Sequence, residues 1–139
     1  MPESANKALN MLLVEEQNLL RKTVALTARS LGMGIVHEAA NLQQADRMLR
    51  ERAYHGAVIS IDCGANPERK YNLTLLDKVR NGLSASDAHM PIAVMVDQAT
   101  ADLMRELRER QINRVILKPF RAKVLLEAFE AFGAKPAPG

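Results

Sequence analysis

The amino-acid sequence predicts an α/β fold, in which a five-stranded parallel sheet is covered by helices on both faces in a doubly wound sandwich. Two observations lead to this fold class. Five short apolar runs alternate with amphipathic stretches along nearly the whole chain. The apolar runs lack period-two alternation, as expected of parallel strands that are buried on both faces. The 139 residues are enough for one domain around one core.

The five apolar runs are the expected strands. They are residues 11–14 (MLLV), 34–36 (GIV), 57–61 (AVISI), 92–96 (IAVMV) and 115–117 (VIL). Parallel neighbours need long crossover connections, and these are right-handed. We therefore expect the flavodoxin-like strand order 2-1-3-4-5, with ligands bound outside the C-terminal ends of the strands.

Apolar residues at helical spacing predict five helices between and after these strands. Their expected buried faces are Leu20, Val24, Ala28 and Leu31; Leu42, Ala45, Met48 and Leu49; Leu73, Leu76 and Val79; Leu103 and Leu107; and Val124, Leu125, Ala128 and Phe132. The domain is expected to span residues 9–132, after an N-terminal tail of residues 1–8. Residues 133–139 are expected to be a tail or a linker, because "AKPAPG" cannot continue a helix.

Composition argues against several classes of protein. Hydrophobic residues at 47% and charged residues at 25% are ordinary for a soluble domain. No apolar run approaches the roughly 20 residues of a membrane-spanning helix, and the first residues do not have the pattern of an export signal. A single cysteine, Cys63, allows no internal disulfide. We expect a cytoplasmic protein without a membrane partner.

Basic residues gather between residues 105 and 123. This segment carries +5, whereas the whole chain carries +3, so the remainder sums to −2. Its charge comes from Arg105, Arg108, Arg110, Arg114, Lys118, Arg121 and Lys123, against Glu106 and Glu109. One interpretation is a solvated helix face. The other is a contact surface for an acidic partner, a nucleotide or a nucleic acid.

Four stretches carry motifs in a characteristic order. "LLVEEQNLLRKTVALTARSLG" places an acidic pair at the end of a strand, and "EAANLQQADRMLRERAYHGAVISIDC" contains a helix and a buried strand. "MPIAVMV" and "VILKPF" follow as two further strands. In this order they resemble the receiver domain of bacterial response regulators, over roughly residues 9 to 132. The resemblance implies a signalling protein of a two-component or phosphorelay system, and not an enzyme.

The resemblance also implies a phosphorylation site at the strand ends. In receivers, two acidic side chains and an acceptor aspartate bind Mg²⁺, and the acceptor takes a phosphoryl group from a phosphohistidine. A Ser or Thr after the fourth strand and a lysine after the fifth then bind the phosphate.

The acidic pair here is Glu15 and Glu16. Each glutamate places its oxygens roughly 1.3 Å farther out than an aspartate would, and Mg²⁺ tolerates little departure from octahedral geometry. We therefore expect Mg²⁺ to bind weakly through Glu15, Glu16 and Asp62, with no cofactor required. The alternative is that the two glutamates only stabilise the N-terminus of the following helix.

Ser60 falls at the acceptor position. A serine hydroxyl without an adjacent base is a poor nucleophile near neutral pH, so the simplest interpretation is a small buried serine that bonds to the backbone. Val96 occupies the Ser/Thr position and cannot form a hydrogen bond to a phosphate. Both departures predict a degenerate phosphoacceptor site.

Lys118 and Pro119 match the ending of the family's fifth strand, where the peptide bond between them is usually cis. We expect Lys118 to neutralise Glu15, Glu16 or Asp62. Asp62 itself either pairs with Lys118, faces solvent, or replaces Ser60 as the acceptor if the strand slips by two residues.

The leading hypothesis is a receiver-like protein that acts by protein–protein contact, with aspartyl phosphorylation degenerate or lost. The resemblance implies a histidine kinase, a phosphotransfer protein or an output protein as partner, and a homodimer through the fourth helix, fifth strand and fifth helix. Two alternatives are a working phosphoacceptor that uses Asp62, and a cyclic-dinucleotide sensor that binds through the arginine-rich face. Direct DNA binding is least favoured, because the chain has no attached helix-turn-helix domain.

Overall fold

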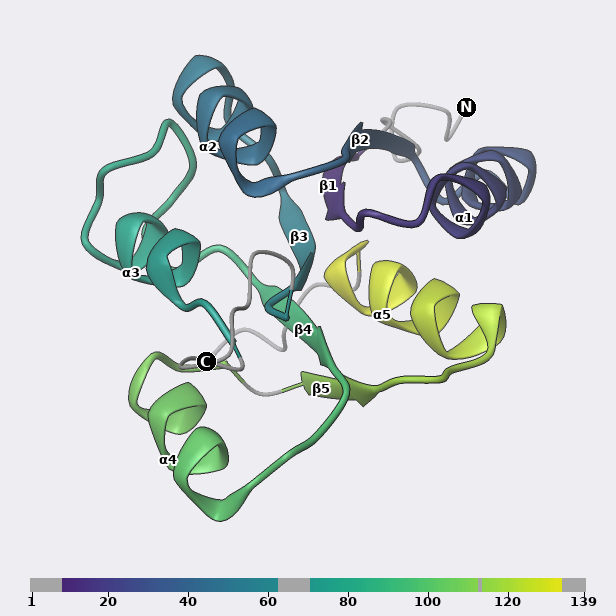
Figure 1. The fold of residues 1–139 in the computed structure, drawn as a ribbon. Helices are drawn as coiled ribbons and strands as arrows, with labels where there is room; N and C mark the ends of the chain where they lie inside the picture. The colour runs from purple at the N-terminus through teal and green to yellow at the C-terminus, as the bar shows by residue number, and fades with distance from the viewer. Residues whose placement is uncertain (1–8, 63–70, 113, 134–139) are drawn as a thin grey trace, which may run out of the picture.

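The computed structural model describes residues 9–62, 71–112 and 114–133. Within these residues five strands alternate with five helices (Figure 1). In chain order the elements are β1 (Asn10–Val14), α1 (Asn18–Ser30), β2 (Ile35–Ala39), α2 (Leu42–Glu51), β3 (Gly56–Ser60), α3 (Thr74–Arg80), β4 (Ile92–Val96), α4 (Ala101–Glu109), β5 (Arg114–Leu117) and α5 (Ala122–Gly133).

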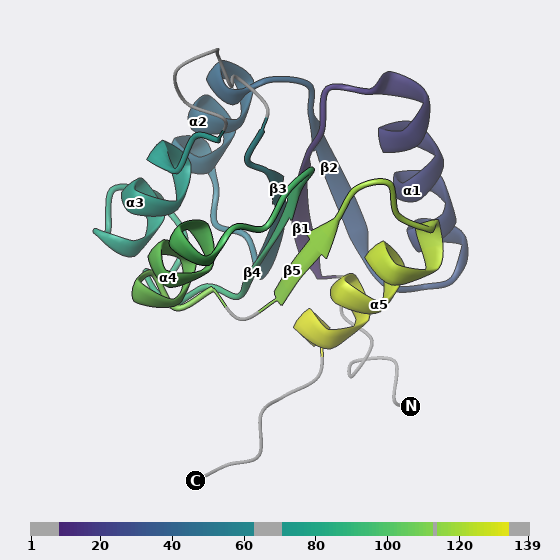
Figure 2. The same cartoon turned by 60° about the horizontal axis from the view of Figure 1, so that its bottom comes forward.

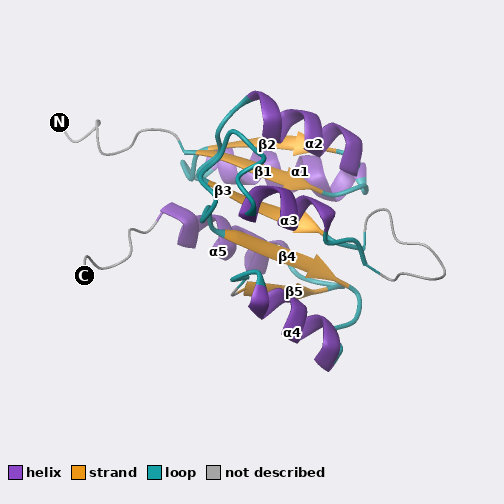
Figure 3. Ribbon diagram, turned by 90° about the vertical axis from the view of Figure 1, so that its left-hand side faces the viewer, coloured by secondary structure: helices purple, strands orange, loops and turns teal. Residues whose placement is uncertain are grey.

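The five strands form one parallel sheet in the order β2-β1-β3-β4-β5, which confirms the predicted flavodoxin-like order. Leu12 of β1 pairs with Ala57 of β3, and Val94 of β4 pairs with Val115 of β5. Figure 3 shows the strand arrows pointing the same way, so their C-terminal ends form a single edge of the sheet. The residues that come directly after the strands are therefore brought together at this edge.

Helices cover both faces of the sheet. In Figure 2, α1 and α5 lie on one face, and α2, α3 and α4 lie on the other. Successive strand residues point to opposite faces, so Leu12 and Val14 pack with α2, α3 and α4, whereas Met11 and Leu13 pack with α1 and α5. Every residue of β3 and β4 is buried. This burial explains why the sequence of these strands shows no polar alternation.

The limits of four strands differ from the prediction. β1 and β5 each begin one residue earlier, at Asn10 and Arg114. β2 runs from Ile35 to Ala39 and not over residues 34–36, because His37 and Glu38 continue the pairing with β1. β2 lies at the edge of the sheet, where polar side chains reach solvent. β3 ends at Ser60, one residue earlier than predicted.

Two residues that were expected on buried helix faces are exposed. Leu31 lies beyond the end of α1 and is 60% exposed, because the chain turns away at Gly32 with a φ of 71°. Val124 is 37% exposed, whereas Phe129, absent from the predicted face, is fully buried. Phe129 lies one helical turn after Leu125, so it continues the buried face from which Val124 departs.

Side-chain caps define where two helices begin. Asn41 Oδ1 accepts the backbone N–H of Gln44 at 2.8 Å before α2, and Thr100 Oγ1 accepts that of Leu103 at 3.1 Å before α4. Each cap stabilises its helix by about 1 kcal/mol. The Thr100 cap fixes the start of α4 close to Asp97, the residue after β4.

Three sequence predictions concern parts of the chain that the structure does not describe. The N-terminal tail, the segment from residue 134 onward and Cys63 lie outside the described residues. Among the helices that are described, none is long and apolar enough to cross a membrane.

Candidate functional site

Side chains from three strand ends meet at the C-terminal edge of the sheet. Lys118 follows β5 and directs its ammonium group at Ser60, Asp62 and Glu15. Its Nζ atom donates to Ser60 Oγ at 2.5 Å and to Asp62 Oδ1 at 2.8 Å. It also lies 3.4 Å from Glu15 Oε1. The structure thus brings together four residues that the sequence assigned to the candidate site.

Asp62 uses both of its carboxylate oxygens. Oδ1 accepts hydrogen bonds from Lys118 Nζ and from the Ser60 hydroxyl, at 2.8 Å each. Oδ2 accepts the backbone N–H of Asp97 at 3.1 Å. Because Asp97 follows β4, one carboxylate connects the ends of β3, β4 and β5.

Glu15 is buried, with 2% of its surface exposed. Its Oε2 accepts the backbone N–H of Gln17 at 2.9 Å, just before α1. Its Oε1 is buried without a well-aligned hydrogen bond among the described residues, so the 3.4 Å contact with Lys118 is an ion pair and not a directed bond. Glu16, by contrast, is exposed. The two members of the acidic pair therefore have different surroundings.

The arrangement of these carboxylates does not suit a metal ion. No group of three His, Cys, Asp or Glu side chains that could hold a metal occurs in the described part of the chain. The Asp62 and Glu15 oxygens at the centre of the site already face the Lys118 ammonium. An incoming Mg²⁺ would have to displace that cation, so the donor set does not fit Mg²⁺ as it stands.

Arg21 is a site residue that sequence reasoning missed. It is buried on α1, where its Nη1 donates to the Glu15 carbonyl at 2.7 Å and its Nε to Glu38 Oε1 at 3.1 Å. These bonds fix the turn that carries Glu15. The available signal was helical spacing, because Arg21 falls three residues before Val24 on the buried face of α1.

The charges of Asp62 and Lys118 stabilise each other. Burial tends to raise the pKa of Asp62, but hydrogen bonds from Lys118 and Ser60 outweigh it and hold this pKa below its ordinary value. Burial tends to lower the pKa of Lys118, but Asp62 and Glu15 outweigh it and raise this pKa. Lys118 is therefore protonated near neutral pH and cannot act as a base for the Ser60 hydroxyl.

Ser60 and Val96 are both inaccessible. Ser60 is fully buried, and its hydroxyl bonds to the side chains of Asp62 and Lys118, so the expectation that it bonds to the backbone is wrong. Val96 packs in the core beneath α4. The peptide bond between Lys118 and Pro119 is cis, as the family resemblance implies.

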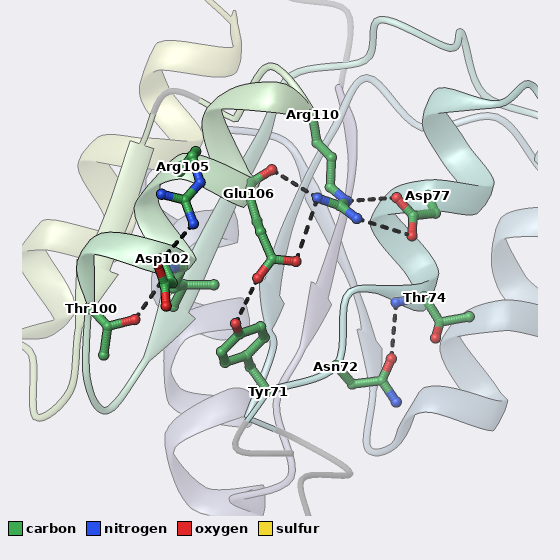
Figure 4. Close-up of polar contacts among 10 residues, drawn as sticks. Tyr71, Asn72, Thr74, Asp77, Thr100, Asp102, Arg105, Glu106 and Arg110 are labelled. Atoms are coloured by element: carbon green, nitrogen blue, oxygen red, sulfur yellow. Dashed lines mark hydrogen bonds and ion pairs between the residues drawn. The ribbon is translucent and has the colours of Figure 1, made fainter. Parts of the chain in front are cut away.

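The basic residues of the segment from 105 to 123 have different surroundings (Figure 4). Arg105 pairs with Asp102 at 2.8 Å on the surface of α4. Arg110 binds Asp77 of α3 through Nε at 2.6 Å, and its Nη1 donates to the Glu106 carbonyl. The hydrogen bond with Asp77 raises the pKa of Arg110. Arg110 therefore has little capacity left for a phosphate ligand.

The remaining basic side chains are exposed at two edges of the sheet. Arg114 begins β5, whereas Arg121 and Lys123 follow the end of that strand. Arg108 lies on α4 and is also exposed. The arginine-rich face of the sequence prediction is thus divided between the two ends of β5.

Comparison with protein-family models and with curated proteins gives no match for this sequence. Solved structures do match. The receiver domain of HemR from Leptospira biflexa is 21% identical with a TM-score of 0.77, over 96% of this chain and 99% of that chain. The chain has the receiver fold.

Two other receivers with this fold are more distant in sequence. A CheY-like receiver domain from Methanospirillum hungatei is 15% identical with a TM-score of 0.75, over 91% of this chain and 94% of that one. The chemotaxis response regulator CheY4 of Vibrio cholerae is 16% identical with a TM-score of 0.74, over 91% of this chain and 99% of that one. At such identities the receiver fold is shared, and the chemistry depends on the site of each chain.

Proposed function

We propose that this protein is a receiver-like signalling module of a two-component system that acts through protein contacts without aspartyl phosphorylation. The observation that carries this proposal is the double contact of Asp62, which binds the Lys118 ammonium with one oxygen and the Asp97 N–H with the other. The lysine after the fifth strand and the segment after the fourth strand are the parts that hold a phosphate in receivers. Here a carboxylate of the chain already engages both.

The surroundings of Ser60 support the loss of phosphorylation. A phosphoryl donor must reach the accepting oxygen, but Ser60 has no exposed surface. Its hydroxyl proton is directed at Asp62, and its oxygen accepts a bond from Lys118. The low pKa of Asp62 makes this carboxylate a weak base, so it does little to activate the hydroxyl.

Asp62 also supplies the negative charge that a phosphate would bring. With this carboxylate in place, the ends of β3, β4 and β5 are connected without any added group. Val96 offers no hydroxyl to bind a phosphate, so a second, phosphate-bound arrangement lacks one of the two side chains that stabilise it in receivers. We infer that the strand ends of the module keep one arrangement. The module then signals through its presence, or through binding to and release from a partner protein.

Exposed side chains on β5 and α5 support a contact surface. Leu117 and Val124 are large apolar residues with substantial exposure. Arg121 and Lys123 are exposed beside them in the chain, and neither forms an ion pair within the described residues. This combination of exposed apolar and basic side chains fits an acidic patch on a partner. The candidates are a histidine kinase, a phosphotransfer protein, an output protein or a second copy of the chain.

The test is incubation with acetyl phosphate and Mg²⁺, followed by intact-protein mass spectrometry. We expect no mass gain of a phosphoryl group in the wild type, and none in Asp62→Asn or Ser60→Ala. A gain in the wild type that disappears in Asp62→Asn would refute the proposal and favour the alternative in which Asp62 is the acceptor.

A further inference from the structure

A pocket lies at the N-terminal edge of the sheet, at the opposite end of the strands from Lys118. Its volume is about 450 Å³, within the range of roughly 300–1,000 Å³ that is usual for small-molecule sites. Six of the residues that line it carry the argument: Arg80, His89, Ile92, Gln111, Arg114 and Phe132. We refer to it as the basal pocket.

Arg80 gives the basal pocket a fixed positive charge. Its guanidinium donates to the backbone carbonyls of Arg110 at 2.7 Å, Ala88 at 2.9 Å and Met90 at 2.8 Å. No carboxylate accepts a hydrogen bond from Arg80 within the described residues. Burial lowers the pKa of Arg80, and the charge of nearby Asp87 offsets this only in part. The cation is rigidly held and incompletely neutralised.

Three more polar side chains line the basal pocket. Arg114 is exposed and forms no ion pair with the described part of the chain. His89 is exposed and also lines the pocket, with Nδ1 3.6 Å from Asp87 Oδ1. Gln111 adds a neutral amide to the lining. This set can bind an anion with both charge and directed N–H donors.

The lining of the basal pocket also includes the apolar residues Ile92 and Phe132. Ile92 packs with the core on the α2, α3 and α4 face of the sheet, whereas Phe132 packs on the α1 and α5 face. The Phe132 ring packs over Gly56, where an added Cβ would lie 2.5 Å from Phe132 Cδ2, and it meets the Phe129 ring edge-on with centroids 6.1 Å apart. The aromatic ring is therefore held in place, as a wall against which a flat group can stack.

We propose that the basal pocket binds an organic phosphate with a flat ring, of the size of a mononucleotide. Arg114 contacts the phosphate, Arg80 adds positive charge, and the ring lies against Phe132. This function goes beyond the proposed signalling contact, because the site lies at the other end of the sheet and shares no residue with the Lys118 cluster.

The test uses AMP as the probe, with adenosine and inorganic phosphate as separate arms, in isothermal titration calorimetry. We expect saturable AMP binding and weaker binding of both partial ligands. Loss of the charge-assisted bonds of Arg114 should weaken AMP binding by about tenfold or more in Arg114→Ala. Arg108→Ala is the matched control, because Arg108 is an exposed arginine of α4 that does not line the pocket.

Amide chemical-shift mapping of the same titration locates the site. We expect the largest shifts at His89, Gln111 and Phe132, and small shifts at Asp62 and Asp97. Four outcomes would each overturn the proposal. The first two are the absence of saturable AMP binding, and equal AMP affinities of Arg114→Ala and Arg108→Ala. The other two are shifts centred on the Lys118 cluster, and binding of inorganic phosphate as tight as that of AMP. None of these outcomes depends on whether the protein is phosphorylated.

Discussion

Two aspartates that follow neighbouring strands have opposite roles. Asp62 has only 14% of its side chain exposed and binds Lys118, Ser60 and the backbone of Asp97. Asp97 is exposed and contributes its backbone N–H, which any residue other than proline would supply at that position. Substitutions at these two aspartates can therefore be compared, to separate the effect of a buried, paired carboxylate from that of an exposed carboxylate at a neighbouring strand end.

Asp62→Asn should lower the free energy of unfolding by about 2–4 kcal/mol, because it leaves the Lys118 ammonium without its nearest opposite charge. Asp97→Asn should change it by less than about 0.5 kcal/mol. Urea denaturation followed by circular dichroism measures both values. Equal effects of the two substitutions would show that Asp62 is not what holds the strand ends together.

The stability that Asp62 contributes should depend on pH. Although burial tends to raise the pKa of Asp62, hydrogen bonds from Lys118 and Ser60 keep it below the ordinary 3.8 in the folded state. This stabilisation is therefore complete above pH 3.8 and is lost as the pH falls through the lower folded value. Lys118 shows the opposite sign, because its folded pKa lies above 10.5 and its contribution is lost only at higher pH.

The measurement is the difference in unfolding free energy between the wild type and Asp62→Asn at a series of pH values. We expect a constant difference through neutral pH and a progressive decrease below pH 3.8. A difference of unchanged size in stronger acid would contradict the assignment of the charge to Asp62.

The helices α3 and α4 are held together by polar contacts between side chains as well as by apolar packing in the core. Arg110, at the end of α4, binds Asp77 of α3 (Figure 4). Glu106 of α4 accepts a hydrogen bond from the Tyr71 hydroxyl at 2.7 Å, shortly before α3. Both contacts hold the outer surface of α4 against the preceding helix.

Arg110→Ala should destabilise the fold by about 1 kcal/mol, because it removes a partly exposed ion pair and a hydrogen bond to the Glu106 carbonyl. Arg108→Ala should leave stability within about 0.5 kcal/mol of the wild type. Thermal unfolding monitored by calorimetry compares the two variants. A larger loss in Arg108→Ala would contradict this view of how α4 is held.

Local pattern explains why the sequence predicted the elements so well. The residues of β3 and β4 are all buried, so an unbroken apolar run is a sufficient signal for each strand. The pairing of Asp62 with Lys118 spans 56 residues and was predicted only because the family resemblance placed both at strand ends. The bond from Asp97 to Asp62 and the pocket around Arg80 depend on loop and helix-end geometry, which has no periodic signature in the sequence.

For the whole molecule, β5 connects the two candidate sites. Arg114 begins this strand in the basal pocket, and Lys118 directly follows its end in the Asp62 cluster. The four residues of β5 span only about 13 Å. The opposite edges of the sheet therefore hold chemically distinct sites: the Asp62 cluster, whose charges are paired with each other, and the basal pocket, whose cations are incompletely neutralised.

The packing of Phe132 over Gly56 sets a limit on how short a folded fragment of this protein can be. The ring belongs to the last turn of α5, yet it covers the first residue of the central strand. A truncation that removes this turn would uncover the middle of the sheet, and a bulkier residue at position 56 would displace the helix end. We therefore expect the cooperative folding unit to include residue 132, even though the motifs of the sequence end a full helix earlier.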